Sequence, residues 1–443
     1  MRALALALLF LALPARLPAH AQDLQQVYRD AKGYDAQFAA ARHALKAGLE
    51  KLPQGRALIL PTLDLTSNAT STRIETEPHN SAVAPVTLRD ARSYGYSLSF
   101  RQPVFRKQND LQYNQAEFQV KQAEASFGQS GQDLIVRTAQ AYFDVLAARD
   151  TLALVQAQKA AISEQLAQAK RNFEVGTATI TDTHEAQARF DLSAAQEIAA
   201  QGDLETKQRA LQQITGKEYA ALRTLRPQVK LSPPNPSGMQ SWVEIAEKQG
   251  YPVLIQESAT EIANLEAKRT VAGHYPTVDL VASYGQTSQT ASQLSAISSN
   301  ITTGVFGLQL GLPLYQGGAI SSREREAAAN YEKAKQDLEN ARRTQALTAR
   351  QTFVLVTNGI AQVGALEQAL VSSQSALDSN KLGYEVGVRI NIDVLNSQQQ
   401  LFSTQRDLAV ARYNPITNHL KLKAAAGSLR EEDLEEVNRA LAP

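Results

Sequence analysis

The chain has 443 residues, of which 43% are hydrophobic and 20% charged, and its formal net charge is +1. This composition is typical of an ordered protein, and a charge so near zero excludes the basic surface that nucleic-acid binding requires. Because there is no cysteine, disulfides, thiolate metal sites and a lipid anchor on cysteine are excluded as well.

The first residues predict a secretory signal peptide. Arg2 precedes an apolar run over residues 3–13, and an A-x-A sequence follows at 19–21, a pattern typical of such peptides. We expect residues 1–21 to be removed, so that the mature chain begins near Gln22. The apolar run is too short to span a bilayer, and we expect no transmembrane helix in the remainder.

After the signal peptide, a helical pattern over residues 24–52 is followed by two predicted strands, at about 60–70 and 93–104. In the second strand aromatic residues and leucine alternate with serine and arginine, which predicts one apolar and one polar face. The Ser-, Thr- and Asn-rich stretch over 67–92 predicts a long loop. Pro103 marks a strand-to-helix junction, since proline cannot donate to a strand ladder.

A very long helix is predicted next, from about residue 106 to 173. Its apolar residues recur at steps of four and three, which is the 3.5-residue period of a coiled-coil seam, and only Lys159 interrupts the series. At about 1.5 Å per residue such a helix would extend on the order of 100 Å, so we expect it to project. The seam consists of Leu134, Thr138, Ala141, Val145, Ala148, Leu152, Val155, Lys159, Ile162, Leu166, Ala169 and Phe173.

Two similar sequences each end one long helical pattern and begin another. Phe173-Glu174-Val175-Gly176 leads to Asp182, and Tyr384-Glu385-Val386-Gly387 leads to Asp393. Each residue of the second copy stands 211 positions after its counterpart in the first. A glycine after the last helical turn tolerates positive φ, and an aspartate a few residues later can cap the next helix. Each copy is therefore interpreted as the tip of a helical hairpin.

The two tips belong to an internal duplication. We divide the chain into a first structural repeat over 22–216, a Pro-rich linker over 217–240, a second repeat over 241–427 and a C-terminal segment over 428–443. The second repeat has a helical stretch over 242–271, strands at about 275–285 and 304–314, a loop over 285–303, and helices over 319–384 and 393–426. Pro313 mirrors Pro103.

The four predicted strands have the length and alternation of strands that cross an outer membrane. Four strands cannot close into a barrel, so the chain must oligomerise; two copies would supply eight strands and three copies twelve. We favour twelve strands around a wet lumen, because polar side chains would point inward. These are Asp64, Ser97, Ser99, Arg101, Asp279 and Gln309.

Several passages resemble the TolC-type outer-membrane channels of efflux and type I secretion, over nearly the whole mature chain. The first repeat contributes Ala141–Leu146, Phe173–Asp182 and Gln213–Gly216. The second contributes Pro276–Leu280, Leu312–Gly318, Tyr384–Leu395 and Ala411–Asn414. Because cysteine is absent, the resemblance is to the branch without a lipid anchor.

The resemblance implies a mainly helical homotrimer in the outer membrane: a twelve-stranded β-barrel, a twelve-helix α-barrel crossing the periplasm, and an equatorial belt formed by 217–240 and 428–443. It implies an exit duct without cofactors. The partners implied are outer-membrane lipid, a periplasmic adaptor protein and an inner-membrane transporter of the RND, ABC or MFS class, and no nucleic acid. Which pump and which substrates the duct serves is not set by the sequence.

The resemblance also implies roles for residues at the tips. Thr181 and Asp182 would hold Arg389 and Tyr384 across neighbouring hairpins, and Asp393 would form a ring of carboxylates, a possible cation site. Asn396 stands where these channels carry a second aspartate ring. The adaptor would dock on the tip residues Val175, Gly176, Thr177, Val386, Gly387 and Val388.

Plainer interpretations of the same residues exist. Asp182 and Asp393 can be helix N-caps, Asp182 with Glu185 fits a capping box, and Arg389 can be a solvated charge. The six histidines show no metal-ligand spacing, and no catalytic motif such as G-x-S-x-G or a phosphate loop is present, so we expect no enzyme. The alternative to a duct is a non-conducting periplasmic coiled-coil spacer or scaffold, which would not need the four strands.

Overall fold

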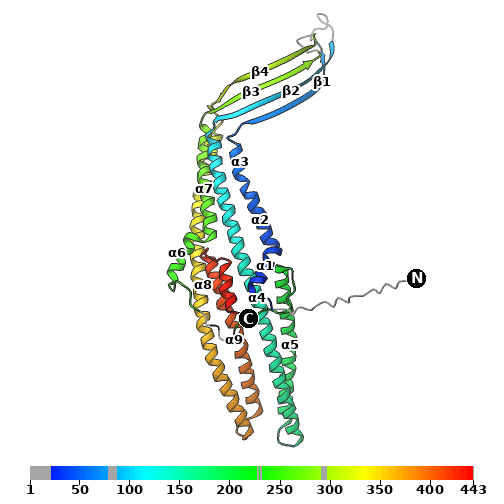
Figure 1. Ribbon diagram of the computed structural model, residues 1–443, viewed down its shortest axis with the longest axis vertical. Coiled ribbons are helices and arrows are strands. Elements are labelled where there is room, and N and C mark those ends of the chain that lie inside the picture. Colours follow the sequence, from blue (N-terminus) through cyan, green and yellow to red (C-terminus); the bar gives the residue numbers. More distant parts are fainter. Residues whose placement is uncertain (1–20, 78–86, 227–228, 230–231, 291–296, 443) are drawn as a thin grey trace, which may run out of the picture. The chain divides into compact units, whose positions relative to one another are not determined.

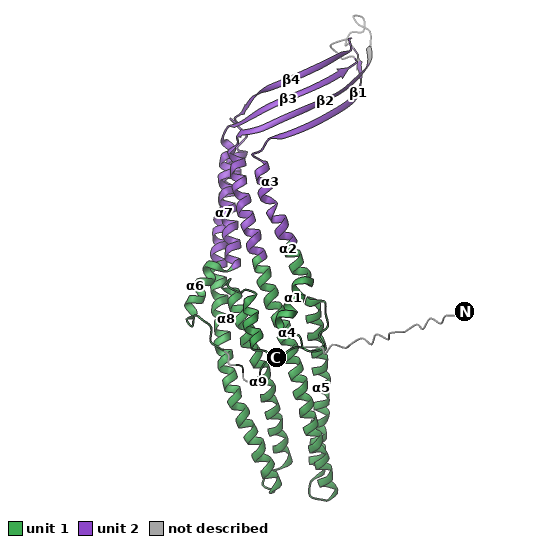
Figure 2. Ribbon diagram, viewed as in Figure 1, with its two compact units in different colours: residues 1–42, 128–250, 342–443 green, residues 43–127, 251–341 purple. Residues whose placement is uncertain are grey.

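A computed structural model describes residues 21–77, 87–226, 229, 232–290 and 297–442 (Figure 1). The predicted signal peptide lies, apart from Ala21, outside these residues. The chain divides into two compact units (Figure 2): unit 1 is drawn from 1–42, 128–250 and 342–443, and unit 2 from 43–127 and 251–341.

Unit 2 contains one antiparallel sheet of four strands in the order β1-β2-β3-β4. The strands are β1 (Thr62–Thr76), β2 (Thr87–Phe105), β3 (Thr277–Gln289) and β4 (Ser299–Gly311). The helices of unit 2 run from one end of this sheet and leave its faces uncovered (Figure 1). Among the described residues, the first and last strands, β1 and β4, each pair with a single strand.

The strands extend further than the alternation alone predicted. Most of the described part of 67–92, predicted as a loop, pairs as strand: the β1–β2 register runs without a break from Thr62 opposite Arg101 to Thr76 opposite Thr87. Serine and threonine dominate this stretch, and threonine fits a pleated, solvated surface well. The prediction failed there because it took polar composition as a sign of a loop. The rest of the predicted loop, 78–86, lies outside the described residues.

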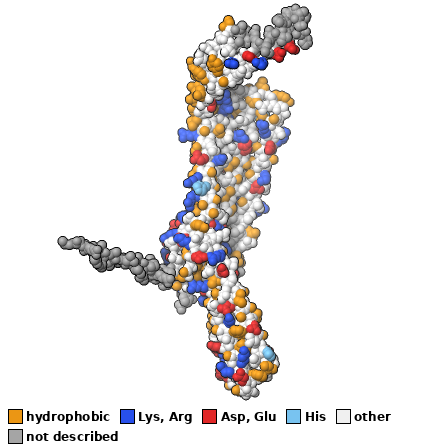
Figure 3. Space-filling model, turned by 90° about the vertical axis from the view of Figure 1, so that its right-hand side faces the viewer, with side chains coloured by type: hydrophobic (Ala, Val, Ile, Leu, Met, Phe, Trp, Pro, Cys, Tyr) orange, Lys and Arg blue, Asp and Glu red, His pale blue; other side chains and the backbone are white. Residues whose placement is uncertain are grey.

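The cross-strand register sorts the side chains onto two faces. Asp64, Ser99, Ser283 and Val305 stand in one row across the four strands, and all six predicted inward-pointing residues share this face. The opposite face is apolar in the part of the sheet nearer the helices, and Figure 3 shows hydrophobic side chains gathered on the sheet. Its exposed hydrophobic members are Leu63, Leu65, Tyr94, Tyr96, Leu98, Tyr284, Phe306, Leu308 and Leu310. Farther along, this face carries the ion pair of Arg73 with Asp90.

Two details at the base of the sheet differ from the prediction. Pro103 does not end β2, because the strand continues through a register shift between Pro103 and Phe105; Pro313 does follow the end of β4. Asp279 lies on the polar face but is buried, since the Nε atom of Arg106 donates to its Oδ1 at 2.7 Å and a second bond forms between the same side chains. A buried carboxylate needs such a partner.

Each of the two shorter predicted helical stretches is interrupted in the structure. The stretch 24–52 is divided into α1 (Leu24–Tyr34), α2 (Ala36–Leu49) and α3 (Lys51–Ala57). The stretch 242–271 is divided into α6 (Met239–Gln249) and α7 (Tyr251–Val271), and a short 3₁₀ turn, η1 (Ala272–His274), follows α7. Of these helices, α1, α6 and part of α2 belong to unit 1. Gly250 ends α6, and a Cβ there would lie 2.6 Å from the Ala246 carbonyl oxygen.

Unit 1 contains two long helical hairpins. Helix α4 (Lys107–Glu174) turns into α5 (Ile180–Thr215), and α8 (Ala319–Glu385) turns into α9 (Asn391–Ala425); α4 and α8 begin in unit 2. The predicted seam of α4 is buried except at Leu152 and Lys159, which are partly buried, and at Phe173, which is exposed. The Lys159 ammonium is accommodated by a 2.8 Å ion pair with Glu197 on α5 and by the Phe190 ring beneath it.

The segments after each hairpin pack together in unit 1. Leu225 in the linker pairs with Leu441 in a single antiparallel bridge, next to the short helix α10 (Glu432–Arg439). The fully buried Tyr142 of α4 donates to the Arg223 carbonyl at 2.7 Å. On α9, the Tyr413 hydroxyl donates to Asp150 at 2.5 Å, and burial raises the pKa of both groups.

Helix α8 contains an apolar stretch that the sequence reasoning missed. By length and composition alone it could cross a membrane, with a mean hydropathy of 1.3, yet only 17% of it is buried within the chain. Among its exposed side chains are Val354, Leu355 and Val371. An exposed apolar face of this kind indicates that another molecule covers it.

Candidate functional site at the hairpin tips

The two tips share one backbone design. Gly176 and Gly387 have φ of 77° and 79°, which confirms the prediction that a glycine with positive φ ends each long helix. In both tips a later amide closes the turn: Thr177 N donates to Asn172 O at 2.8 Å, and Val388 N donates to Gly383 O at 2.9 Å. These bonds satisfy carbonyl groups that the helix end would otherwise leave free.

The helices that leave the tips begin differently. At α5 the N-cap is Thr179, whose hydroxyl accepts from Asp182 N at 3.3 Å while the Asp182 carboxylate accepts from Thr179 N at 2.9 Å. This is a capping box, but it lies three residues before the predicted box of Asp182 with Glu185. The N-cap of α5 is Thr179 rather than Asp182. The corresponding N-cap of α9 is Ile390, whose apolar side chain cannot accept a hydrogen bond from the helix N-terminus.

Within one chain the predicted latch residues have other partners. The Asp182 carboxylate is bound to Thr179, and the exposed Thr181 has no hydrogen bond to Arg389 or Tyr384. The Nη1 atom of Arg389 lies 3.6 Å from Oδ2 of Asp393, and these two side chains are 58% and 34% exposed. The latch across neighbouring hairpins therefore stays a prediction, and Arg389 is free enough to exchange partners.

Near the tips, hydrogen bonds that the sequence did not predict join the two hairpins among the described residues. The Asn172 amide donates to the Tyr384 hydroxyl at 3.2 Å. The Arg189 guanidinium donates to Asn396 Oδ1 at 2.9 Å and also to Gln399. The available signal for Arg189 was its position two helical turns after Asp182, which places both on one side of α5.

The tips also expose apolar side chains. Val175, Val386 and Val388 are 73%, 65% and 75% exposed, and Ile180 and Ile390 beside them are exposed as well. The residues predicted to meet an adaptor therefore form apolar ends on both hairpins. In the part of the chain that the structure describes, no group of three or more His, Asp or Glu side chains could hold a metal ion.

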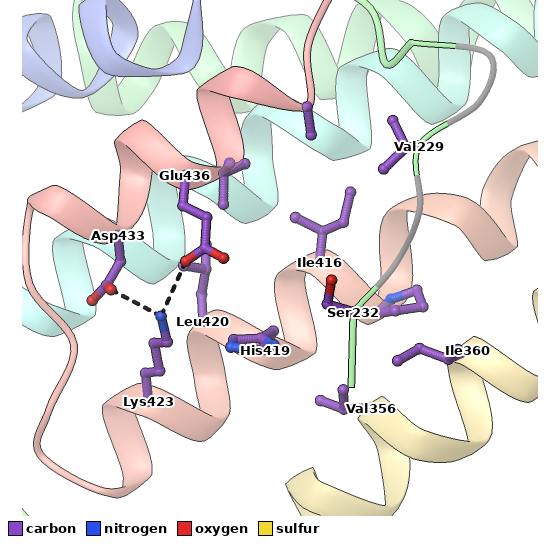
Figure 4. A pocket seen from close by; sticks show the side chains of 13 residues that line it. Val229, Ser232, Val356, Ile360, Ile416, His419, Leu420, Lys423, Asp433 and Glu436 are labelled. Atoms are coloured by element: carbon purple, nitrogen blue, oxygen red, sulfur yellow. Dashed lines mark hydrogen bonds and ion pairs between the residues drawn. The ribbon is translucent and has the colours of Figure 1, made fainter. Parts of the chain in front are cut away.

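A recess in unit 1 carries ionisable groups away from the tips (Figure 4). It is a cavity of about 160 Å³ between α8, α9, α10 and the linker. Lys423 donates to Asp433 at 2.9 Å and to Glu436 at 3.5 Å, while burial, reinforced by Lys423, lowers the pKa of His419. These bonds fasten α10 to α9, so we assign the recess a structural role.

Comparison with known proteins gives one consistent result. The model of the family described as "Outer membrane efflux protein" matches residues 27–217 and again 255–428. The chain is 32% identical to "Outer membrane protein TolC" of Vibrio cholerae, over 95% of this chain and 94% of that protein. It is also 32% identical to "Proteases secretion protein PrtF" of Dickeya chrysanthemi, over 95% and 91%.

A solved structure shares the fold. The outer membrane protein VceC of Vibrio cholerae superposes with a TM-score of 0.77 at 20% identity, covering 91% of this chain and 96% of that one. The predicted per-chain fold, mainly helical with four antiparallel strands and two long hairpins, is confirmed.

Proposed function

Because this chain belongs to the outer membrane efflux protein family, which makes it an outer-membrane channel and not an enzyme, we propose that it works as a trimeric exit duct. In this proposal three chains form a β-barrel in the outer membrane and an α-barrel that projects into the periplasm. A periplasmic adaptor and an inner-membrane transporter recruit the duct at its tips.

The four-stranded sheet carries this proposal. Its edge strands β1 and β4 have 15 and 13 residues, and in the part of the chain that the structure describes each leaves one row of backbone donors and acceptors without a strand partner. Long unpaired edges are avoided in soluble proteins and are not tolerated in lipid. Pairing β4 of one chain with β1 of the next removes every edge, and three copies then give twelve strands.

The two faces of the sheet fit such a barrel. The apolar face, with Phe306 80% and Leu308 70% exposed, suits contact with lipid. The polar row that contains Asp64, Ser99 and Ser283 suits a water-filled lumen. A periplasmic spacer without a lumen would gain nothing from a sheet that is apolar on one face and polar on the other.

Exposed apolar residues on the helices support trimer assembly. The stretch of α8 that includes Val354, Leu355 and Val371 is mostly uncovered in one chain. A neighbouring chain packed against it would bury this surface, and the 3.5-residue period of the seam in α4 fits extended side-by-side helix packing.

At the tips we propose that closure and docking take place together. Arg389 and Asp393 are paired only loosely within one chain, so in the trimer Arg389 can turn to Thr181 and Asp182 of a neighbouring hairpin. Asp393 would then form one ring of carboxylates, which concentrates charge at a constriction. The exposed valines around Gly176 and Gly387 offer the adaptor an apolar surface.

Relatives named for efflux and for protease secretion both support a duct that serves efflux, type I secretion or both. We propose that substrate choice is made by an RND, ABC or MFS transporter, since a duct of this kind passes what the transporter delivers.

Fractionation of cells that express the protein tests the proposal. We expect it in the outer membrane, migrating in SDS as a trimer that dissociates only on heating. Recovery as a soluble periplasmic monomer would favour the spacer and contradict the duct.

A further inference from the structure

One side chain links the two hairpins of a chain next to their tips. Arg189, on α5, donates through one guanidinium nitrogen to Asn396 Oδ1 at 2.9 Å and through another to Gln399 Oε1, both on α9. We propose that Arg189 is a clasp that holds the two hairpins together and places a fixed positive charge at the entrance of the duct. The charge effect rests on the proposed function, whereas the clasp does not.

The partners of Arg189 leave its charge in place. Asn396 and Gln399 are neutral amides, and no carboxylate among the described residues forms an ion pair with Arg189. On α5 itself, Glu185 stands one turn before Arg189 and Asp191 two residues after it, but Asp191 accepts from Gln187 at 2.9 Å instead. On α9, Asp393 lies beside Arg389. Asn396 follows Asp393 by one helical turn, so the positive charge of Arg189 lies close to the predicted carboxylate ring.

Few other contacts hold the hairpins together at this level. Near the clasp lies an apolar cluster in which Leu166 and Ala169 of α4 and Ala186 of α5 meet Leu395 of α9, with the partly buried Phe190 and Ile392 packed against them. Nearer the tip, Asn172 donates to Tyr384. Beside a cluster of this size, a forked, charge-assisted hydrogen bond contributes appreciably to what opposes separation.

The helices that carry the clasp also contain buried polar atoms without hydrogen-bond partners. In the described part of the chain four buried side-chain atoms lack a hydrogen-bond partner, and three of them lie in the first turns of α5 and α9: Thr183 Oγ1, Asn391 Nδ2 and Gln398 Oε1. A buried polar atom without a partner raises the free energy of the arrangement that buries it. An arrangement of the tips that exposes these atoms to water would be spared this cost.

Hydrogen–deuterium exchange of the purified full-length protein in detergent tests the clasp. We expect Arg189→Gln to speed exchange of peptides covering 180–193 and 391–402 by about tenfold, the scale of one or two lost charge-assisted bonds. Arg189→Lys should lie between, because an ammonium cannot bind both amides as a fork does. Asn396→Asp should slow exchange by turning the bond into an ion pair.

Arg209→Gln is the matched control, since Arg209 is also on α5 but pairs with Glu218 far from the tips. We expect it to leave exchange at the tips unchanged. Exchange that is equal in Arg189→Gln and in the wild type would overturn the clasp, as would faster exchange in Asn396→Asp.

The charge is tested separately in planar bilayers under a KCl gradient. We expect Arg189→Gln to shift the reversal potential toward greater cation selectivity and to raise the single-channel conductance. An unchanged reversal potential would overturn the charge effect. A wild-type protein that forms no channel would contradict the proposed duct, while the exchange experiment would still decide the clasp.

Discussion

The assignment of the two sheet faces can be tested by placing the same charge on each. Phe306 and Val305 are neighbours on β4, 80% and 51% exposed in one chain, and the register puts them on opposite faces. Phe306 stands with Ala282 and Phe100, whereas Val305 stands in the row of Ser283, Ser99 and Asp64. Phe306→Arg should therefore enter lipid and Val305→Arg the lumen.

The expected difference is large. An arginine on the lipid face near the bilayer midplane destabilises a barrel by about 2–4 kcal/mol, and a trimer carries three copies, for a total of roughly 6–12 kcal/mol. An arginine in a wet lumen retains its hydration, so its effect on stability should stay within about 1 kcal/mol.

The assay is the yield of heat-modifiable trimer in the outer membrane and, for purified protein refolded into lipid vesicles, the urea concentration at half-unfolding. We expect Phe306→Arg to lower both strongly, Val305→Arg to lower neither, and Phe306→Leu to behave as the wild type. Equal behaviour of the two arginine variants would refute the assignment of lipid and lumen faces.

Three further predictions concern the tips and the anchoring of α1. Arg389→Ser should raise single-channel conductance in a planar bilayer by loosening the tips; unchanged conductance would refute the assigned latch. Asp393→Asn should weaken block by divalent or trivalent cations added on the periplasmic side, and block as strong as in the wild type would exclude Asp393 as the site. Burial opposes ionisation of Asp35, yet hydrogen bonds from Arg137 at 3.0 Å and from the backbone outweigh it and lower its pKa. This pair therefore stabilises the fold above the ordinary carboxyl pKa of about 4 and is lost as the pH falls below it. Asp35→Asn should cost about 2 kcal/mol at pH 7, because Arg137 is left without its buried partner. It should also flatten the loss of helical circular dichroism below about pH 4; an unchanged acid transition would contradict the assignment.

The hairpins and their tips were predictable from the sequence because their determinants are local. A 3.5-residue apolar period specifies the buried side of α4. At both tips the backbone takes positive φ, which glycine adopts most readily, and Gly176 and Gly387 occupy these positions. The alternation in β2 likewise indicated a two-faced strand. Even Lys159, which interrupts the seam, lies at the predicted seam position and is accommodated by Glu197 on the adjacent helix.

The remaining features depend on partners that no local pattern reveals. Asp279 was expected in a wet lumen, but it is buried and paired with Arg106, far away in the sequence. The contact of Arg189 with Asn396 joins residues in different repeats; the position of Arg189 relative to Asp182 indicates its side of α5 but not its partner on α9. The N-cap of α5 was predicted three residues too late, because Thr179 and Asp182 are both competent caps and the backbone conformation of the tip decides between them.

Single-channel recording of the purified wild-type protein in a planar lipid bilayer tests the central claim most directly. The account predicts discrete steps of current from heat-modifiable trimers, reduced by multivalent cations added on the side of the hairpin tips. Folded trimers that insert into the bilayer and pass no current would contradict a conducting duct.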